Sequence, residues 1–320
     1  MPLPRIAVIG AGSFGRNHLR VVRDSAQADL AAVVDADAAK ATAAGAEFGA
    51  PALADWRELA GKADAAIIAA PTSAHAEIAC GLMEAGLDVL VEKPIAVTVA
   101  EAERMCEVAR TRGRILQVGH LERFNPAIIA LEKALTIPLF FEIHRMSVFT
   151  PRSLDVDVVL DLMIHDIDLV LALTGLEPEE VRAAGVRILS DKVDIANVRL
   201  AFPGGCIANL TASRASTEKI RKLRLFQPHQ YISIDYAKQE GVVINVGENR
   251  QIGFAPLAVE KHEPLAAQFA AFLNSIATRQ APRVDGPAAT RALKVSHVIL
   301  VKIEEHGAQV NARVHGTSGQ

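Results

Sequence analysis

The sequence predicts an α/β protein of two domains: a first domain with a parallel sheet covered by helices, and a second, α+β domain with an open, mostly antiparallel sheet. The length of 320 residues fits two domains of about 150 residues each. Continuous apolar runs alternate with helical segments over residues 1–120. Segments rich in Val, Ile and aromatic residues, separated by Gly and Pro, occupy residues 181–257.

The expected elements follow in chain order. In the first domain we expect strands at 6–9, 30–34, 65–70, 89–91 and 114–119, and helices at 14–26, 36–48, 74–85 and 99–112. Buried apolar strands that alternate with helices are typical of βαβ units. In the second domain we expect helices at 126–135, 155–174, 264–278 and 287–305, with strands at 138–149 and within 181–257. The predicted boundaries are 1–122, 123–306 and a flexible tail at 307–320.

The composition excludes several classes of function. With 34 basic and 37 acidic residues, the chain shows no sign of a nucleic-acid or membrane-surface partner. No run approaches the roughly 18 apolar residues of a membrane helix, and the N-terminus reads as a strand that enters a turn, not as a secretory signal. Three cysteines without a CxxC pair indicate a reducing compartment, so we expect a cytoplasmic protein.

A glycine-rich loop lies close to the start of the chain. Gly10-Ala11-Gly12-Ser13-Phe14-Gly15 has the form GxGxxG, follows the first expected strand and begins the first helix. Gly10 permits the turn, Gly12 lets a pyrophosphate approach the backbone, and Gly15 lets helix and strand pack closely. This context predicts a Rossmann dinucleotide-binding domain. The alternative is a glycine-rich turn without a ligand.

The cofactor expected at this loop is NAD rather than NADP. Asp35, at the end of the second strand, would accept hydrogen bonds from the adenosine ribose, and its carboxylate repels a 2′-phosphate. Arg16 and Lys40 are nearby cations that soften this preference. We assign the following residues to cofactor binding: Gly10, Gly12, Ser13, Phe14, Gly15 and Asp35.

Polar residues also follow the third and fourth strands. The carboxyl ends of parallel strands line the ligand crevice, so Lys93 is a candidate for proton transfer beside the nicotinamide. Pro94 restricts the backbone of Lys93 to extended conformations. A surface ion pair is the alternative for Lys93, and a structural role is the alternative for His75. The predicted cofactor contacts from these segments are Pro71, Thr72, His75, Glu92 and Lys93.

The segment at 155–171 reads DVDVVLDLMIHDIDLVL. Asp161, His165 and Asp168 share one stripe of a helix whose other residues are strongly apolar. Burial of these polar groups is unfavourable without partners, so we assign Asp161 and His165 to acid–base chemistry and substrate orientation, with Asp168 behind His165. The alternative is a zinc site with His75 or His144 as a third ligand; we expect no metal.

Several polar residues lie near the domain junction. Two or three convergent arginines, among them Arg145, would suit a substrate that carries a phosphate or carboxylate group. The predicted substrate-binding residues are His120, Arg123, Asn125, Arg152 and His165.

These motifs together resemble one family of oxidoreductases. GAGSFG at 10–15, APTSAH at 70–75, EKP at 92–94, GHLERFNP at 119–126 and the Asp161–His165–Asp168 helix resemble the glucose-fructose oxidoreductase, inositol dehydrogenase and MocA family. The resemblance implies hydride exchange between a nicotinamide cofactor and a sugar-like carbinol, with Lys93, Asp161 and His165 as the catalytic group. It also implies association through the second domain's sheet into a homodimer or homotetramer.

Within this family, the segments at 119–127 and 155–171 look most like the branch that oxidises the 3-hydroxyl of UDP-N-acetylglucosamine. That resemblance implies an NAD-dependent dehydrogenase of a sugar or nucleotide sugar. Three alternatives remain: a dehydrogenase of a free sugar or inositol, an NAD-using glycosidase that accumulates no NADH, and a non-enzymatic NAD-binding regulator. The last predicts decay of the catalytic set, which is intact in this sequence.

Overall fold

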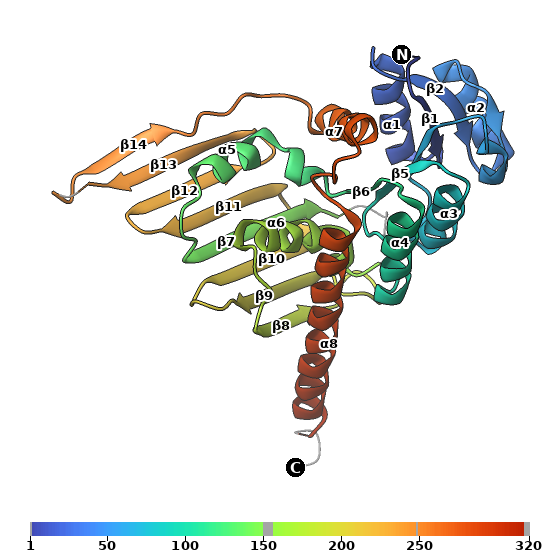
Figure 1. The fold of residues 1–320 in the computed structure, drawn as a ribbon. Helices are drawn as coiled ribbons and strands as arrows, with labels where there is room; N and C mark the ends of the chain where they lie inside the picture. Colours follow the sequence, from blue (N-terminus) through green and yellow to red (C-terminus); the bar gives the residue numbers. More distant parts are fainter. Residues whose placement is uncertain (1, 150–155, 248, 317–320) are drawn as a thin grey trace. The chain divides into compact units, whose positions relative to one another are not determined.

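The computed structural model describes residues 2–149, 156–247 and 249–316, and the chain divides into two compact units (Figure 1). The first unit comprises Met1–Phe124 and Glu263–Thr290, and the second comprises Asn125–His262 and Arg291–Gln320. Each unit contains one sheet and a separate hydrophobic core.

The first unit is built on a six-stranded parallel sheet in the order β3-β2-β1-β4-β5-β6. Its strands are β1 (Arg5–Ile9), β2 (Asp29–Val34), β3 (Ala52–Leu53), β4 (Ala65–Ile68), β5 (Asp88–Glu92) and β6 (Leu116–Gly119). The chain begins in the middle of the sheet and the strand order reverses beside β1. Open parallel sheets bind ligands at the carboxyl ends of their strands next to such a reversal. The expected Rossmann architecture is therefore confirmed.

Helices connect these strands. They are α1 (Ser13–Asp24), α2 (Ala38–Phe48), α3 (Thr72–Glu84) and α4 (Val99–Arg112), with short 3-10 turns η1 (Trp56–Leu59) and η2 (Leu121–Phe124). Local sequence sets their ends. Thr98 and Glu101 form a capping box at the start of α4, and Gly113, with φ of +60°, ends it in a left-handed conformation.

The segment 263–290 packs in the first unit, whereas the sequence-based boundary places it in the second domain. Helix α7 (Pro264–Thr278) buries Leu265, Phe269 and Phe272 in the same core cluster as β1 and α1. The following residues return to the edge of the sheet, where the Val118 amide donates to the Val284 carbonyl at 2.9 Å. The apolar stripe of a helix does not indicate which hydrophobic core the helix will join. The sequence alone therefore does not predict that 263–290 packs in the first unit.

The second unit is built on an eight-stranded sheet in the order β14-β13-β12-β11-β7-β10-β9-β8. The β7–β10 pair is parallel and the other neighbours are antiparallel, which confirms the expected mostly antiparallel sheet. The strands are β7 (Phe140–Val148), β8 (Glu180–Val186), β9 (Ile195–Ala201), β10 (Ile207–Ser216), β11 (Ile220–Gln227), β12 (Gln230–Asp235), β13 (Glu240–Val246) and β14 (Ile252–Pro256).

Helices α5 (Pro126–Ala134), α6 (Ile164–Thr174) and the later part of α8 (Gly286–Gly316) bury apolar side chains with this sheet. Two details differ from the expectations. The helix expected at 155–174 contains a π-helical turn, η3 (Val159–Met163), before α6 begins. Helix α8 also continues to Gly316, through most of the tail that we expected to be flexible. Among the described residues, no helix combines the length and apolar character needed to cross a bilayer.

Candidate active site

The glycine-rich loop joins β1 to α1 in a conformation that its glycines require. Gly10 has a φ of +96°, and a Cβ there would lie 2.5 Å from the Ala69 carbonyl oxygen. A Cβ on Gly15 would lie 1.7 Å from the Gly10 carbonyl oxygen. Gly12 instead faces open space within 4 Å and precedes α1 without providing a side-chain cap. The amides of the first helical turn are thus available to an anion such as a pyrophosphate.

A cavity of about 450 Å³ opens at the carboxyl ends of these strands. Of the predicted cofactor residues, Gly10, Gly12, Asp35 and Pro71 line it. Ser13, Phe14 and Gly15 lie in the first turn of α1, and Thr72 begins α3. The position of the cavity beside the strand-order reversal, together with the open space at Gly12, fits a dinucleotide.

Asp35 lines the cavity and also stabilises the glycine loop through hydrogen bonds. Its two carboxylate oxygens accept hydrogen bonds from the Ala11 amide at 2.8 Å and the Asp37 amide at 2.9 Å. A carboxylate has about four acceptor sites, so two remain for ribose hydroxyls. The cations that would soften a preference for NAD have carboxylate partners: Arg16 pairs with Glu47, and Lys40 with Asp37.

An Asp35→Ser variant is expected to lower the ratio of kcat/KM for NAD over NADP by about 10–100-fold, which corresponds to roughly 1.4–2.8 kcal/mol. Removal of the carboxylate removes the repulsion of the 2′-phosphate, and serine can still accept a ribose hydrogen bond. The ratio is measured from initial rates with each cofactor. Asp29→Ser, at the opposite end of β2, is the matched control and should leave the ratio unchanged. An unchanged ratio for Asp35→Ser would contradict this role.

Part of the cavity wall was not expected from the sequence. Trp56 and Ala54 lie directly after β3, and Ala74 and Ile78 come from α3. Because the strand β3 has only two residues, it does not form a recognisable apolar run, and the sequence does not predict the cavity residues that follow it. Trp56 is the only tryptophan in the chain, and it packs against Gly81, where a Cβ would lie 2.3 Å from the indole. Its fluorescence therefore offers a direct measure of cofactor binding.

Lys93 follows the last residue of β5, and its neighbours on both sides are held by buried groups. The Lys93 amide donates to Glu92 Oε2 at 3.3 Å, and Glu92 Oε1 lies 2.8 Å from Nε2 of His18 on α1. The Lys93–Pro94 peptide is cis. Lys93 itself is partly exposed, whereas Glu92 and His18 are buried. Lys93 is thus accessible, as a residue that contacts substrate must be.

His75 has a structural environment. Its Nδ1 lies 3.0 Å from the Pro94 carbonyl oxygen and its Nε2 lies 2.9 Å from the Ala70 carbonyl oxygen. Burial lowers the pKa of His75 from its ordinary value, which favours the neutral ring with a single N–H. Because both nitrogens face protein carbonyls and the residue does not line the cavity, the structural alternative describes His75 better than cofactor contact.

In the second unit, Asp161 and His165 occupy the π-helical turn and the start of α6. The Ile164 amide donates to the carbonyl of Val159, five residues back, so one additional residue is accommodated in this turn. Such turns occur frequently at functional sites. Asp161 and His165 are partly exposed, whereas Asp166 and Asp168 are buried. Of these four residues, the two assigned to acid–base chemistry are therefore the ones that solvent can reach.

A buried ion pair fixes the helix that carries His165. Arg145 on β7 donates from Nε and Nη2 to the two carboxylate oxygens of Asp166, each at 2.8 Å, and both side chains are only 2% exposed. The guanidinium also lies 5.5 Å from the ring centre of Tyr236. Arg145 thus stabilises the second unit, and it is not one of the arginines available to a substrate phosphate.

A second network fixes the residues before the π-helical turn. Arg214 donates to Asp194 at 2.9 Å and to the Val156 carbonyl at 2.7 Å. Asp194 also accepts three backbone amides from residues 188–190. These hydrogen bonds and the Arg214 guanidinium lower the pKa of the buried Asp194 carboxyl against the opposing effect of its burial. The Val193 amide in turn donates to Asp157 at 2.8 Å, so the chain enters η3 from a fixed position.

The predicted substrate-binding residues are divided between the two units. His120 and Arg123 follow β6 in the first unit, where His120 is buried and Arg123 is partly exposed. Asn125 caps α5 through the Ala127 amide and donates to the Tyr236 carbonyl at 3.1 Å, so its amide is already engaged. Arg152 lies outside the described residues. Among the described residues, no group of three or more His, Cys, Asp and Glu is arranged to hold a metal ion.

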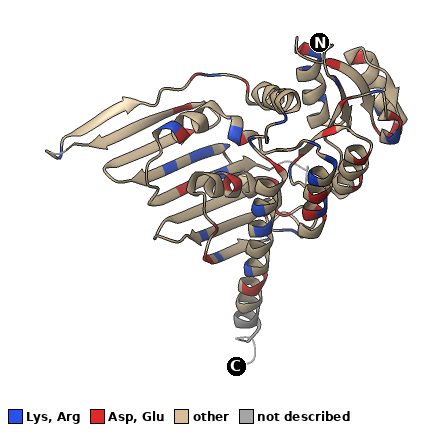
Figure 2. Ribbon diagram, viewed as in Figure 1, with Lys and Arg blue, Asp and Glu red and all other residues tan. Residues whose placement is uncertain are grey.

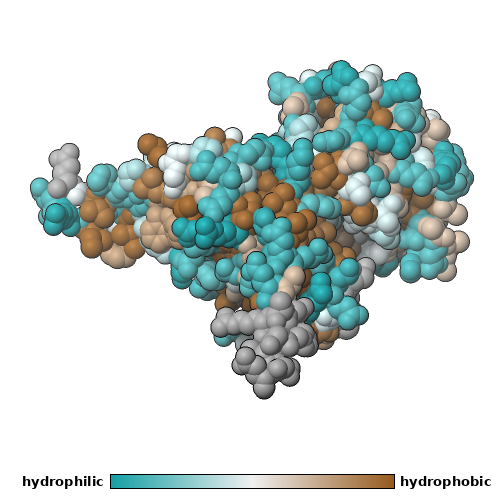
Figure 3. Space-filling view, turned by 90° about the horizontal axis from the view of Figure 1, so that it is seen from below, coloured by the Kyte–Doolittle hydropathy of each residue, from teal (hydrophilic) through white to brown (hydrophobic). Residues whose placement is uncertain are grey.

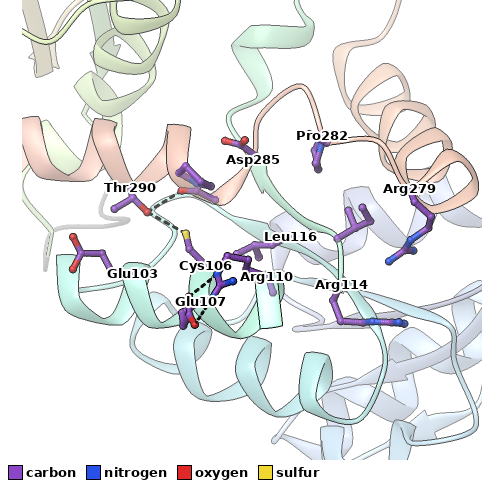
Figure 4. A pocket seen from close by; sticks show the side chains of 15 residues that line it. Glu103, Cys106, Glu107, Arg110, Arg114, Leu116, Arg279, Pro282, Asp285 and Thr290 are labelled. Atoms are coloured by element: carbon purple, nitrogen blue, oxygen red, sulfur yellow. Dashed lines mark hydrogen bonds and ion pairs between the residues drawn. The ribbon is translucent and has the colours of Figure 1, made fainter. Parts of the chain in front are cut away.

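A larger cavity of about 670 Å³ lies elsewhere in the first unit, between α4 and the segment 279–290 (Figure 4). Its charged rim is largely engaged: Arg110 pairs with Glu107, and Arg279 pairs with Asp88. Cys106 faces Thr290, with 3.6 Å between sulfur and hydroxyl oxygen, and burial raises the pKa of its thiol. No predicted site residue lines this cavity.

Comparison with known protein families agrees with this geometry. Residues 4–120 match the family model described as an oxidoreductase family with an NAD-binding Rossmann fold. Residues 141–228 match the model of the GFO/IDH/MocA C-terminal domain. The first match covers the parallel sheet of the first unit, and the second match covers part of the sheet of the second unit. The cofactor of the dinucleotide cavity is NAD.

Individual relatives extend the similarity. The chain is 37% identical to UDP-N-acetylglucosamine 3-dehydrogenase from Acidithiobacillus ferrooxidans, over 94% of this chain and 97% of that protein. A solved structure of that protein has a TM-score of 0.90 and covers 95% of this chain and 99% of its own. An inositol 2-dehydrogenase from Rhizobium meliloti is 32% identical over 67% of this chain and 69% of that protein. The chain therefore belongs to the glucose-fructose oxidoreductase, inositol dehydrogenase and MocA family of NAD-binding oxidoreductases.

Proposed function

We propose that the protein is an NAD-dependent dehydrogenase that oxidises the 3-hydroxyl of UDP-N-acetylglucosamine to a ketone. One observation carries the proposal: similarity to the Acidithiobacillus ferrooxidans protein extends over 94% of this chain and so includes both units. The similarity to the Rhizobium meliloti inositol 2-dehydrogenase covers 67% of the chain. A nucleotide sugar is therefore favoured over a free sugar or inositol.

The proposed reaction requires a group that removes a proton from the sugar hydroxyl. Lys93 Nζ or the His165 imidazole accepts this proton, because each belongs to a residue that is partly exposed and is of a type used in general base catalysis. Asp161 accepts a hydrogen bond that orients the hydroxyl or the imidazole. Gly10, Gly12 and Asp35 would hold NAD, which would supply the acceptor for the hydride of the carbinol carbon.

The diphosphate of a nucleotide sugar requires cationic partners. Arg123 is partly exposed, and we propose that it binds this group together with Arg152, since a guanidinium matches phosphate oxygens in bidentate geometry. His120 would contribute a further hydrogen bond. We leave Arg145 and Asn125 out of this set because their polar groups are engaged within the second unit.

The test is formation of NADH, followed by absorbance, when protein and NAD are mixed with candidate substrates. The panel contains UDP-N-acetylglucosamine, other UDP-sugars, free hexoses and inositol, each with and without 2-oxoglutarate. We expect NADH with UDP-N-acetylglucosamine. NADH with free polyols alone would discard the nucleotide-sugar assignment. Silence across the panel, with bound NAD recovered after denaturation, would favour a retained-cofactor glycosidase or a regulator.

We further propose that copies of the chain associate through the face of the second unit's sheet that carries the partly exposed Glu142, His144 and Tyr231. Basic residues are concentrated on β11 of this sheet (blue in Figure 2). Apolar side chains gather near the tip of the β13–β14 hairpin (Figure 3), where Ile252 and Phe254 are 64% and 75% exposed.

We also propose a cytoplasmic location, because all three cysteines are free thiols.

A further inference from the structure

A buried pair of polar side chains lies directly behind Lys93. His18 and Glu92 are 1% and 7% exposed, and 2.8 Å separates Nε2 of the imidazole from Oε1 of the carboxylate. His18 belongs to α1, whereas Glu92 is the last residue of β5. Burial of two such polar groups carries a desolvation penalty, which a well-aligned hydrogen bond offsets. Because the pair lies beside a candidate catalytic residue, we ask what it contributes to the site.

The neighbouring strand is shaped around the Glu92 carboxylate. Gly119 on β6 lies opposite Glu92 in the sheet register. A Cβ on Gly119 would lie 2.6 Å from both carboxylate oxygens, which is closer than such contacts allow. Any side chain at Gly119 would therefore displace Glu92, and the glycine leaves the room that the carboxylate occupies.

Both neighbours of Lys93 are held from different elements. On one side, Glu92 is bound by His18 and accepts the Lys93 amide at 3.3 Å. On the other side, the Pro94 carbonyl faces His75 Nδ1 at 3.0 Å, and His75 is 1% exposed. The backbone of Lys93 is thus fixed at both ends while its side chain stays partly exposed.

The pair also connects Lys93 to the cofactor loop. The His18 ring meets the Phe14 ring edge-on, with 5.4 Å between ring centres. Phe14 lies in the first turn of α1 and belongs to the glycine loop, whose Gly10 and Gly12 line the cavity. One short chain of contacts therefore runs from the glycine loop through Phe14, His18 and Glu92 to the Lys93 backbone.

We propose that His18 and Glu92 are positioning residues for Lys93: they fix the lysine backbone relative to the cofactor loop, so that the side chain is held in place for proton transfer from a substrate hydroxyl. This inference rests on the role proposed for Lys93 above. A displacement of about 1 Å at a reacting group costs on the order of 10²-fold in rate, so a hydrogen bond far from the substrate is sufficient to matter.

The test compares single-turnover NADH formation from UDP-N-acetylglucosamine in two variants. His18→Phe keeps a ring against Phe14 but removes the hydrogen bond, and we expect the rate to fall by about 10–100-fold. His18→Gln places an amide nitrogen near the position of Nε2 and should recover most of this loss. The Kd for NAD, from Trp56 fluorescence, should change by no more than about threefold in both variants. Val22→Ala, which loosens the packing of α1 but keeps both the His18 and the Glu92 side chains, is the matched control and should retain the parent rate.

A double variant separates positioning from a general structural role. In a Lys93→Ala background, adding His18→Phe should slow turnover no further, because His18 acts only through the lysine. Additional slowing of the double variant, or a loss in Val22→Ala equal to that in His18→Phe, would overturn the proposal. Full turnover by Lys93→Ala alone would instead refute the proposed role of Lys93, so the two failures are distinguishable.

Discussion

Replacement of Lys93 by alanine is expected to lower kcat for UDP-N-acetylglucosamine by about 10²–10⁴-fold, the range that a positioned general acid or base contributes. Lys93 follows β5 and does not line the cavity that contains Asp35. We therefore expect the Kd for NAD to stay within about threefold of the parent value, a change below 1 kcal/mol. The rate is measured by NADH absorbance and the Kd by quenching of Trp56 fluorescence.

Lys62→Ala provides the matched control for this variant. Lys62 is an exposed lysine of the same unit, 3.8 Å from Glu58, and exposed pairs of this kind contribute little. Its removal should leave kcat unchanged. Restoration of part of the Lys93→Ala rate by added ethylamine would identify the missing group as an amine. An equal loss of NAD affinity in Lys93→Ala would show that the lysine binds the cofactor rather than moving a proton.

Replacement of Arg145 by alanine is expected to lower the free energy of unfolding by about 3–5 kcal/mol, since it leaves the Asp166 carboxylate buried without its partner. Both side chains are 2% exposed and make two hydrogen bonds of 2.8 Å. The measurement is urea denaturation followed by far-ultraviolet circular dichroism, together with hydrogen exchange of the amides of α6. Exchange should accelerate in α6, and turnover should fall with it because His165 stands on that helix.

Two further variants test the origin of that loss. Arg182→Ala removes an exposed arginine that pairs with Glu180 on β8, and it should change the stability by less than about 1 kcal/mol. A double replacement, Arg145→Met with Asp166→Leu, removes both charges and should recover much of the stability lost in Arg145→Ala. A stability loss below about 1 kcal/mol for Arg145→Ala would contradict the importance of this pair.

Much of the first unit could be predicted because its signals are local. Apolar runs that end in Gly10, Asp35, Pro71 and Glu92 correspond to β1, β2, β4 and β5. The spacing within the glycine loop requires no knowledge of distant residues, and Gly10 and Gly15 have the close approaches that the motif implies. Strand β3 is not predictable because two residues carry no periodicity. For the same reason the sequence does not place Trp56 in the cavity wall.

The second unit was less predictable in detail. The acidic helix was recognised, but its π-helical turn was not, because the sequence pattern of an inserted residue resembles that of a regular helix. The sequence suggests Arg145 as one of several arginines suited to a substrate phosphate or carboxylate, whereas in the structure it binds Asp166 in the core. An arginine beside a proposed site has the same appearance in sequence whether its partner is a phosphate or a buried carboxylate.

The class of each sheet and the dinucleotide loop follow from the sequence alone, because they depend on neighbours in the chain. The tertiary structure alone decided which charged groups are engaged and which remain accessible. The return of α7 to the first unit and the pairs His18–Glu92 and Arg145–Asp166 join residues far apart in sequence. Such partners are selected by three-dimensional packing, since a buried charge is stable only where the fold brings its counterpart within hydrogen-bond distance.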